Sequence, residues 1–387
     1  MNLARRHQPT AQMPHDLDQP QPLLAGLSAN QFMAAHWQKR PLLIRGAMDV
    51  SDLRLSQKNL FQLAGKEGVE SRLIARKGED WSLRHGPFSA RTLGAVKADA
   101  WTLLVQGVEA HDARVAAVLN AFRFLPDARL DDIMVSWATD GGGVGPHFDS
   151  YDVFLLQISG TRKWQIGPQQ DLSLVPGMPL KILANFEPTE THLLAPGDML
   201  YLPPKWAHDG IAQGADCMTV SVGFRAPARA GLANEVLLRM GEMFEDEALY
   251  ADADQAATAT PARMPGAIGA FARDAIQEML AVPNALECAL GEVMTEPKPG
   301  VWFEAPAMAF SADVPLRVSA KTKLLYDDQH VFINGESYLA AGQDFVVLQQ
   351  LANDRCINTK GLASLSEDAQ ALVSEWYEAG WLEADLL

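Results

Sequence analysis

The feature that most constrains the fold is a change in hydrophobic pattern at Pro227. Between about residue 100 and residue 225, short β-rich runs alternate with Gly and Pro turns, namely TLLVQGV, DDIMVSWA, YDVFLLQIS, RKWQIG, THLLAPGDMLYLPP and CMTVSVGF. Many short strands at this spacing are typical of an antiparallel sandwich or barrel. Upstream, Ser28 is suited to cap a short helix that begins near Ala29, and the apolar residues 42–44 after Pro41 predict a strand. We therefore expect a β-barrel preceded by a helix and a strand.

After Pro227 the apolar residues follow a helical spacing, as at Leu232, Val236, Leu237, Met240 and Phe244. A second helical run covers AIGAFARDAIQEMLAVPNALECALGEVM. The apolar stripes of these helices predict a two-fold symmetric dimer interface. Beyond residue 297, strand-like runs surround Asp327–Asp328 and a turn at Asn334–Gly335, and an amphipathic helix follows in SEDAQALVSEWYEAGWL. This last region is expected to be a small module of winged-helix type.

The predicted fold class is α+β, with four parts. Residues 1–22 are rich in Pro, Gln and charge and predict a mobile tail. The barrel is expected in residues 23–227, a helical dimerisation domain in residues 228–296, and a winged-helix-like domain in residues 297–387.

The net charge of the chain limits the classes of partner that it is expected to bind. Lys and Arg total 32 against 48 Asp and Glu, which gives a net charge of -16 and disfavours binding to nucleic acid phosphates or anionic membranes. A basic protein partner fits better. The three cysteines are far apart and form no CxxC pair, and neither a signal peptide nor an apolar run of membrane-spanning length is evident. We expect a cytoplasmic protein.

The candidate for chemistry is GGGVGPHFDSYDVFLLQISGTRKWQI, residues 141–166. Alternate residues of a strand face one side, so His147 and Asp149 are predicted to reach one metal ion together. His208, which follows a strand and the Pro203–Pro204 turn, is the candidate for a second imidazole. Two His and one carboxylate leave three positions of an iron open, two for the keto-acid end of 2-oxoglutarate and one for dioxygen.

A cation that could bind the far carboxylate of 2-oxoglutarate follows the Gly160 turn. The planar guanidinium of Arg162 suits a carboxylate because it can donate two hydrogen bonds. Lys163 would point to the opposite face, and strand alternation alone does not decide which of the two faces the site. Gly141–Gly143 match no phosphate-binding pattern and are interpreted as a turn. Trp164 and Trp206 are interpreted as packing residues.

Three stretches resemble the bacterial JmjC-type ribosomal oxygenases: HWQKRP at 36–41, VSWATDGGGVGPHFDSYDVFLLQISGTRKW, and SVGFRAP at 221–227. The resemblance implies a double-stranded β-helix (cupin/JmjC) barrel, a helical dimerisation domain and a winged-helix domain. It also implies Fe(II) bound by His147, Asp149 and His208, with 2-oxoglutarate and dioxygen as co-substrates. Arg162 takes the place of the family's basic residue that binds 2-oxoglutarate, with help from Ser136.

The strand DDIMVSW places Asp132, Met134 and Ser136 on one face, which is expected to face the iron. An acid and a thioether there fit a bound cation with an alkyl stem, such as an arginine side chain. Tyr151 is predicted to flank that stem opposite Met134, and the three residues resemble the family's arginine pocket. Ser221 is a further candidate for a hydrogen bond to the substrate.

The resemblance implies hydroxylation of the β-carbon of an arginine in a large-subunit ribosomal protein, L-sixteen. Three alternatives remain open at this point. The chain could hydroxylate a histidine of a ribosomal protein, it could be a histone-type lysine demethylase, or it could be a non-catalytic cupin-like metal-binding module. Since residues 300–387 are not basic, direct nucleic acid binding by the last domain is not expected.

Overall fold

The computed structural model describes residues 16–53 and 55–385, and the chain divides into two compact units at the Ala226–Pro227 bond. Most of the predicted tail, residues 1–15, lies outside the described residues, while residues 16–22 form a turn that leads into the first helical turn. Within the described ranges, no helix is long and apolar enough to cross a membrane.

The first unit consists of one large antiparallel sheet with short helices. The helices are η1 (Pro22–Leu24), α1 (Ala29–Ala35), α2 (Gln57–Leu63), α3 (Ala90–Gly94), η2 (Val108–Ala110), α4 (Ala113–Val118), η3 (Leu119–Phe122) and η4 (Asp127–Arg129). The strands are β1 (Leu42–Ile44), β2 (Ser71–Lys77), β3 (Asp80–His85), β4 (Ala100–Val105), β5 (Leu130–Ala138), β6 (Asp152–Pro168), β7 (Glu190–Leu194), β8 (Met199–Leu202) and β9 (Trp206–Phe224).

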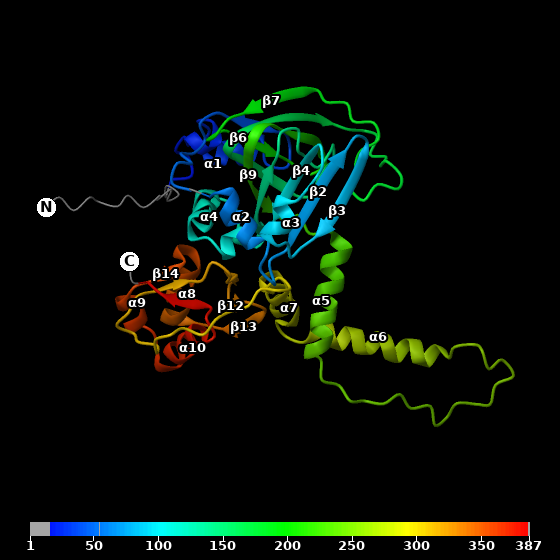
Figure 1. The fold of residues 1–387 in the computed structure, drawn as a ribbon. Coiled ribbons are helices and arrows are strands. Elements are labelled where there is room, and N and C mark those ends of the chain that lie inside the picture. The colour runs from blue at the N-terminus through cyan, green and yellow to red at the C-terminus, as the bar shows by residue number, and fades with distance from the viewer. Residues whose placement is uncertain (1–15, 54, 386–387) are drawn as a thin grey trace. The chain divides into compact units, whose positions relative to one another are not determined.

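The nine strands pair in the order β1-β8-β6-β9-β5-β4-β2-β3, with β7 beside β6, and every pairing is antiparallel. Figure 1 shows β2 between β3 and β4. The predicted antiparallel β-structure is therefore confirmed. The predicted entry is confirmed as well, because Ser28 caps α1 in a reciprocal capping box with Gln31, and β1 follows Pro41.

Two local predictions were wrong. Gly160 does not end a strand: it lies in a bulge within the continuous strand β6, where it has a φ of +62° and where a Cβ would come within 2.9 Å of the Cα of Cys217. In addition, residues 147–149 are not a regular strand. His147 pairs with His208 only as an isolated bridge, since Gly145 has a φ of +78° and Pro146 lacks an amide hydrogen for a ladder.

The two faces of the sheet have different neighbours. Ile133, Val135 and Trp137 of β5 belong to a large apolar cluster with Phe32 of α1 and Leu60 of α2. On the other face of the sheet, which we call the inner face, a smaller apolar cluster is formed by Val153, Leu155, Trp164, Ile166, Leu194, Leu200 and Leu202. Asp132, Met134 and Ser136 alternate with the residues of the first cluster, so they lie on the inner face, as predicted.

The second unit begins with helices and continues as a mixed module. Its helices are α5 (Arg229–Met243), α6 (Gly266–Ala281), α7 (Ala285–Thr295), α8 (Gly342–Asp354), α9 (Thr359–Ala363) and α10 (Glu367–Glu378). Its strands are β10 (Leu316–Val318), β11 (Leu324–Tyr326), β12 (His330–Ile333), β13 (Glu336–Leu339), β14 (Cys356–Ile357) and β15 (Leu382–Ala384). The predicted turn at Asn334–Gly335 is confirmed, because both residues have a positive φ and join β12 to β13.

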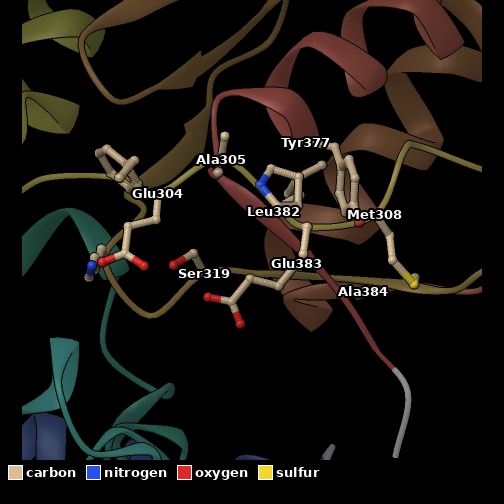
Figure 2. Close-up of a pocket in the computed structure, with 13 residues that line it drawn as sticks. Glu304, Ala305, Met308, Ser319, Tyr377, Leu382, Glu383 and Ala384 are labelled. Carbon is tan, nitrogen blue, oxygen red and sulfur yellow. The ribbon is translucent and has the colours of Figure 1, made fainter.

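A surface hollow of about 420 Å³ lies in the second unit beside strand β15 (Figure 2). Its wall includes Glu304, Met308 and Tyr377 together with Leu382 and Glu383 of β15. None of the predicted site residues lines it.

Candidate metal centre

The three predicted metal ligands converge in the first unit. His147 and Asp149 come from the segment between β5 and β6, and His208 comes from the beginning of β9. Each residue offers one ligand atom, and these atoms lie within 4.8 Å of one another. The Nε2 atom of His208 is 3.5 Å from Oδ2 of Asp149. Two imidazoles and one carboxylate in this arrangement fit a divalent iron that keeps open positions for other ligands.

Both imidazoles are held by their Nδ1 atoms. His147 Nδ1 is 2.9 Å from the carbonyl oxygen of Gly145, and His208 Nδ1 is 3.0 Å from that of Trp206. A carbonyl can only accept, so each Nδ1 donates a hydrogen and each Nε2 carries the lone pair that a metal needs. The two rings are 4.2 Å apart between centroids.

His208 is 3% exposed. Burial lowers the pKa of its imidazole to about 4, the neighbouring His147 acts in the same direction, and Asp149 and the bond to Trp206 oppose the shift. The ring is therefore neutral at physiological pH, which is the form that binds a metal.

Arg162 faces the inner side of the sheet and is 4% exposed, whereas the side chain of Lys163 is only half-buried. Among the described residues, the Nε and Nη2 atoms of Arg162 have no hydrogen-bond partner. A buried guanidinium with unpartnered N–H groups is costly unless a ligand accepts them. A dicarboxylate such as 2-oxoglutarate fits this requirement, because one carboxylate oxygen can accept from each N–H.

Trp164 lies between this cation and the metal ligands. Its ring centroid is 5.8 Å from that of His208, and the guanidinium carbon of Arg162 is 5.8 Å from the same ring. Trp164 is buried within the inner apolar cluster. Its interpretation as a packing residue is consistent with this position.

The strand register brings the other predicted residues together on the inner face. Met134 and Ser136 of β5 lie opposite Ser221 and Thr219 of β9. Across the next pair, Leu155 of β6 lies opposite Ser221. Residues that are directly opposite in an antiparallel pair project to the same side. Ser136, Met134 and Ser221 therefore share one surface.

The Tyr151 ring and the backbone of Asp132 both lie beside Gly223, and the charge of Asp132 contributes to raising the pKa of Tyr151. A Cβ at Gly223 would be 3.8 Å from Cε2 of Tyr151 and 3.8 Å from the backbone oxygen of Asp132. Asp132 is 4% exposed. Burial raises the pKa of Tyr151, and the charge and the hydrogen bond of Asp149 act in the same direction. Tyr151 therefore lies next to Asp149 on one side and next to Asp132 on the other. Asp132, Met134 and Tyr151 together are called the predicted arginine site.

A buried carboxylate anchors the segment that carries these residues. Asp152 is 0% exposed and accepts hydrogen bonds from Tyr201 Oη at 2.7 Å, Gln38 Nε2 at 3.0 Å and Arg129 Nη2 at 3.0 Å. Three donors satisfy a buried charge well. The beginning of β6, three residues after Asp149, is therefore fixed in place.

Sequence reasoning missed two residues that contact the predicted arginine site. Arg72 of β2 places Nη2 3.8 Å from Met134 Sδ, and Gln106 donates from Nε2 to Oδ1 of Asp132 at 3.3 Å. Gln106 lies in the run TLLVQGV, which was predicted as a strand. The position of Arg72 beside the site depends on the pairing of β2 with β4, and no motif in the sequence indicates that pairing.

Comparison with known proteins decides the family. A JmjC domain model matches residues 117–232, and a ROXA-like winged helix model matches residues 277–383. The chain is 32% identical over 360 residues to the Ribosomal protein uL16 3-hydroxylase of Escherichia coli, with 88% of this chain and 93% of that protein covered. The chain belongs to the JmjC-type ribosomal oxygenases. A probable ribosomal oxygenase of Haemophilus influenzae is 35% identical over 53% of this chain and 51% of its own length.

Solved structures of this family agree with the fold. The structure of YcfD, a ribosomal oxygenase from Escherichia coli, in complex with cobalt and 2-oxoglutarate matches with a TM-score of 0.76 at 29% identity, covering 93% of this chain and 98% of that one. Another structure of the same protein matches with a TM-score of 0.78. The predicted family, the JmjC barrel and the winged-helix domain are thus confirmed. The winged-helix match begins within α6, upstream of the predicted boundary at residue 297.

Proposed function

We propose that this ribosomal oxygenase uses Fe(II), 2-oxoglutarate and dioxygen to hydroxylate the β-carbon of an arginine in ribosomal protein uL16. The observation that carries the proposal is the convergence of His147, Asp149 and His208 beside the sheet that carries the buried Arg162, whose Nε and Nη2 atoms have no partner among the described residues. When bound, the iron and its co-substrates supply an oxidant that inserts one oxygen atom into a C–H bond and leave succinate and carbon dioxide.

The chain's own residues hold and orient these groups. The two Nε2 atoms and the Asp149 carboxylate would bind the iron, while the Nδ1 bonds keep both rings in the required tautomer. The Arg162 fork would bind the far carboxylate of 2-oxoglutarate. Ser136, two residues after Met134 on β5, would donate an additional hydrogen bond to 2-oxoglutarate.

An arginine side chain matches the chemistry of the predicted arginine site. The buried Asp132 carboxylate would bind the guanidinium, and Met134 and Tyr151 would contact the alkyl stem. Ser221, opposite Met134 in the sheet, would add a hydrogen bond to the substrate. The net charge of -16 favours a basic ribosomal protein as the partner, and such a substrate would place the reaction in the cytoplasm.

Mass spectrometry of ribosomal proteins tests this function. Purified protein is incubated with Fe(II), ascorbate, 2-oxoglutarate and ribosomal proteins, with His208→Ala protein in parallel. We expect one arginine of uL16 to gain the mass of one oxygen atom with the wild type only. Oxygen on a histidine would instead support a histidine hydroxylase, and loss of methyl groups from methyl-lysine peptides would support a demethylase. Absence of both products and of succinate would support a non-catalytic cupin-like module.

We also propose that the helical region, residues 228–296, forms a homodimer. Ile268, Ile276 and Leu280 of α6 are exposed on one side of the helix, and Phe271 is exposed beside Ile268. Light scattering should give the mass of two chains for the wild type and of one chain for Ile276→Asp. The neighbouring exposed Gln277→Asp serves as the control and should remain a dimer. A wild-type mass of one chain at micromolar concentration would contradict the proposal.

A further inference from the structure

A guanidinium that belongs to the protein itself lies against the predicted arginine site. Arg72 pairs with Leu104, and Leu104 pairs with Ser136, so Arg72 projects from the same inner face of the sheet. Its Nη2 atom is 3.8 Å from Met134 Sδ. On the other side, its Nε atom is 3.8 Å from a carboxylate oxygen of Glu70. A cation thus stands at one edge of a site that is predicted to receive another cation.

Gln106 connects this cation to the acid of the site. Arg72 Nη2 donates to Gln106 Oε1 at 3.0 Å, and Gln106 Nε2 donates to Asp132 Oδ1 at 3.3 Å. A guanidinium can only donate and a carboxylate oxygen can only accept, so the amide has one permitted orientation. The three side chains form a hydrogen-bonded chain with a fixed direction from Arg72 through Gln106 to Asp132.

This chain affects how Asp132 can receive a substrate. A planar guanidinium binds a carboxylate best when the carboxylate plane is held at the right rotation. A bond from Gln106 restrains that rotation. A compact ammonium group cannot make the two parallel bonds of a guanidinium.

We propose that Gln106 and Arg72 are positioning residues that orient Asp132 toward the guanidinium of the substrate and make the site selective for arginine. This inference rests on the proposed function. The selectivity is assigned to Arg72 on β2 and to Gln106, the residue that follows β4. Both act through Asp132 and not on the metal.

Steady-state kinetics with an arginine-containing uL16 peptide test the proposal. For Gln106→Leu we expect the KM for the peptide to rise about tenfold, with kcat changed less than about twofold, since the lost orientation weakens peptide binding. Arg72→Leu should behave in the same way, and Arg72→Lys should recover most of the wild-type KM, because an ammonium group can still donate to Gln106 Oε1. Arg84→Leu is the control, since Arg84 is exposed on β3 and lies over Phe88.

Binding measurements separate positioning from damage to the fold. Titration of each variant with Mn(II) and 2-oxoglutarate, followed by calorimetry, should give wild-type affinities, and titration of the peptide into the Mn(II) and 2-oxoglutarate complex should show the tenfold loss. An unchanged peptide affinity in Gln106→Leu would overturn the inference, as would an equal loss of 2-oxoglutarate affinity. A wild-type protein that oxidises no arginine would refute the proposed function instead, a result that the variants do not influence.

Discussion

Trp164 lies directly over Gly210, and a Cβ at position 210 would come within 2.5 Å of the Trp164 ring. Gly210 is two residues beyond His208 on β9, and it pairs with Trp164 across the sheet. Because the same ring lies near both Arg162 and His208, a displacement of Trp164 would also move the side chains proposed to bind 2-oxoglutarate and iron.

Gly210→Ala should therefore weaken cofactor binding without touching a ligand. The added methyl group has to push the Trp164 ring aside, and overpacking of this kind costs about 1–3 kcal/mol. We expect the affinity for 2-oxoglutarate in the presence of Mn(II) to fall about tenfold or more in calorimetry. Gly94→Ala is the control, because no atom lies within 4 Å of a Cβ there. Unchanged 2-oxoglutarate binding would show that the ring can move freely.

Replacement of Arg162 should have opposite effects on the free and the bound protein. Arg162→Leu removes a buried cation whose Nε and Nη2 have no partner among the described residues, so the melting temperature of the free protein should not fall. The increase in melting temperature on addition of Mn(II) and 2-oxoglutarate should disappear, with a loss of affinity of about 100-fold. Lys163→Leu, at the neighbouring position, should keep the ligand-dependent increase. If Arg162→Leu still gained stability from 2-oxoglutarate, Arg162 would not be the residue that binds the far carboxylate of 2-oxoglutarate.

The stability of the metal-free protein should depend on pH through His208. The pKa of this buried imidazole is lowered from 6.5 to about 4. Between these values the unfolded chain binds a proton that the folded chain does not, so stability falls as the pH falls. From pH 7 to pH 5 the free energy of unfolding should decrease by about 2 kcal/mol from this residue, as measured by urea unfolding with a chelator present. His208→Phe should lack this component, and equal pH dependence in both proteins would contradict the assignment.

Asp152→Ala should destabilise the whole first unit. The substitution leaves the Arg129 guanidinium and the Tyr201 hydroxyl without their buried acceptor, and breaking a buried ion pair costs about 3–5 kcal/mol. Thermal unfolding should show a melting temperature several degrees lower. Asp80→Ala, an exposed carboxylate on β3, is expected to change it little. If both variants melted alike, the three bonds to Asp152 would contribute nothing net.

Much of the fold could be predicted from local pattern. The cap at Ser28, the apolar run before Pro203 and the turn at Asn334–Gly335 each specify their structure within a few residues. The continuous strands β6 and β9 could not be predicted in this way, because Gly160 is typical of a turn and only the register with β9 makes it a bulge.

The three metal ligands could be predicted from the sequence, but the reason for their convergence is not the strand alternation on which the prediction was based. His147 and Asp149 converge although they are not in a regular strand, since the bridge to His208 and the bond from Nδ1 to Gly145 fix the segment instead. Arg72 and Gln106 were not accessible, because their importance depends on which strands are neighbours. Long-range pairing of this kind leaves little trace in a single sequence.

The hydrogen bonds to Asp152 and the hydrogen-bonded chain from Arg72 through Gln106 to Asp132 come from different parts of the first unit, and this has an evolutionary consequence. The first set ties β6 to β8 and to the residue before β5, whereas the second reaches Asp132 from β2 and from the end of β4. If Arg72 and Gln106 orient Asp132 as proposed, substitutions at these two positions change which substrate side chain is accepted, while the segment of His147 and Asp149 keeps its shape. In such a barrel the substrate protein can change during evolution while the residues proposed to bind iron and 2-oxoglutarate stay the same.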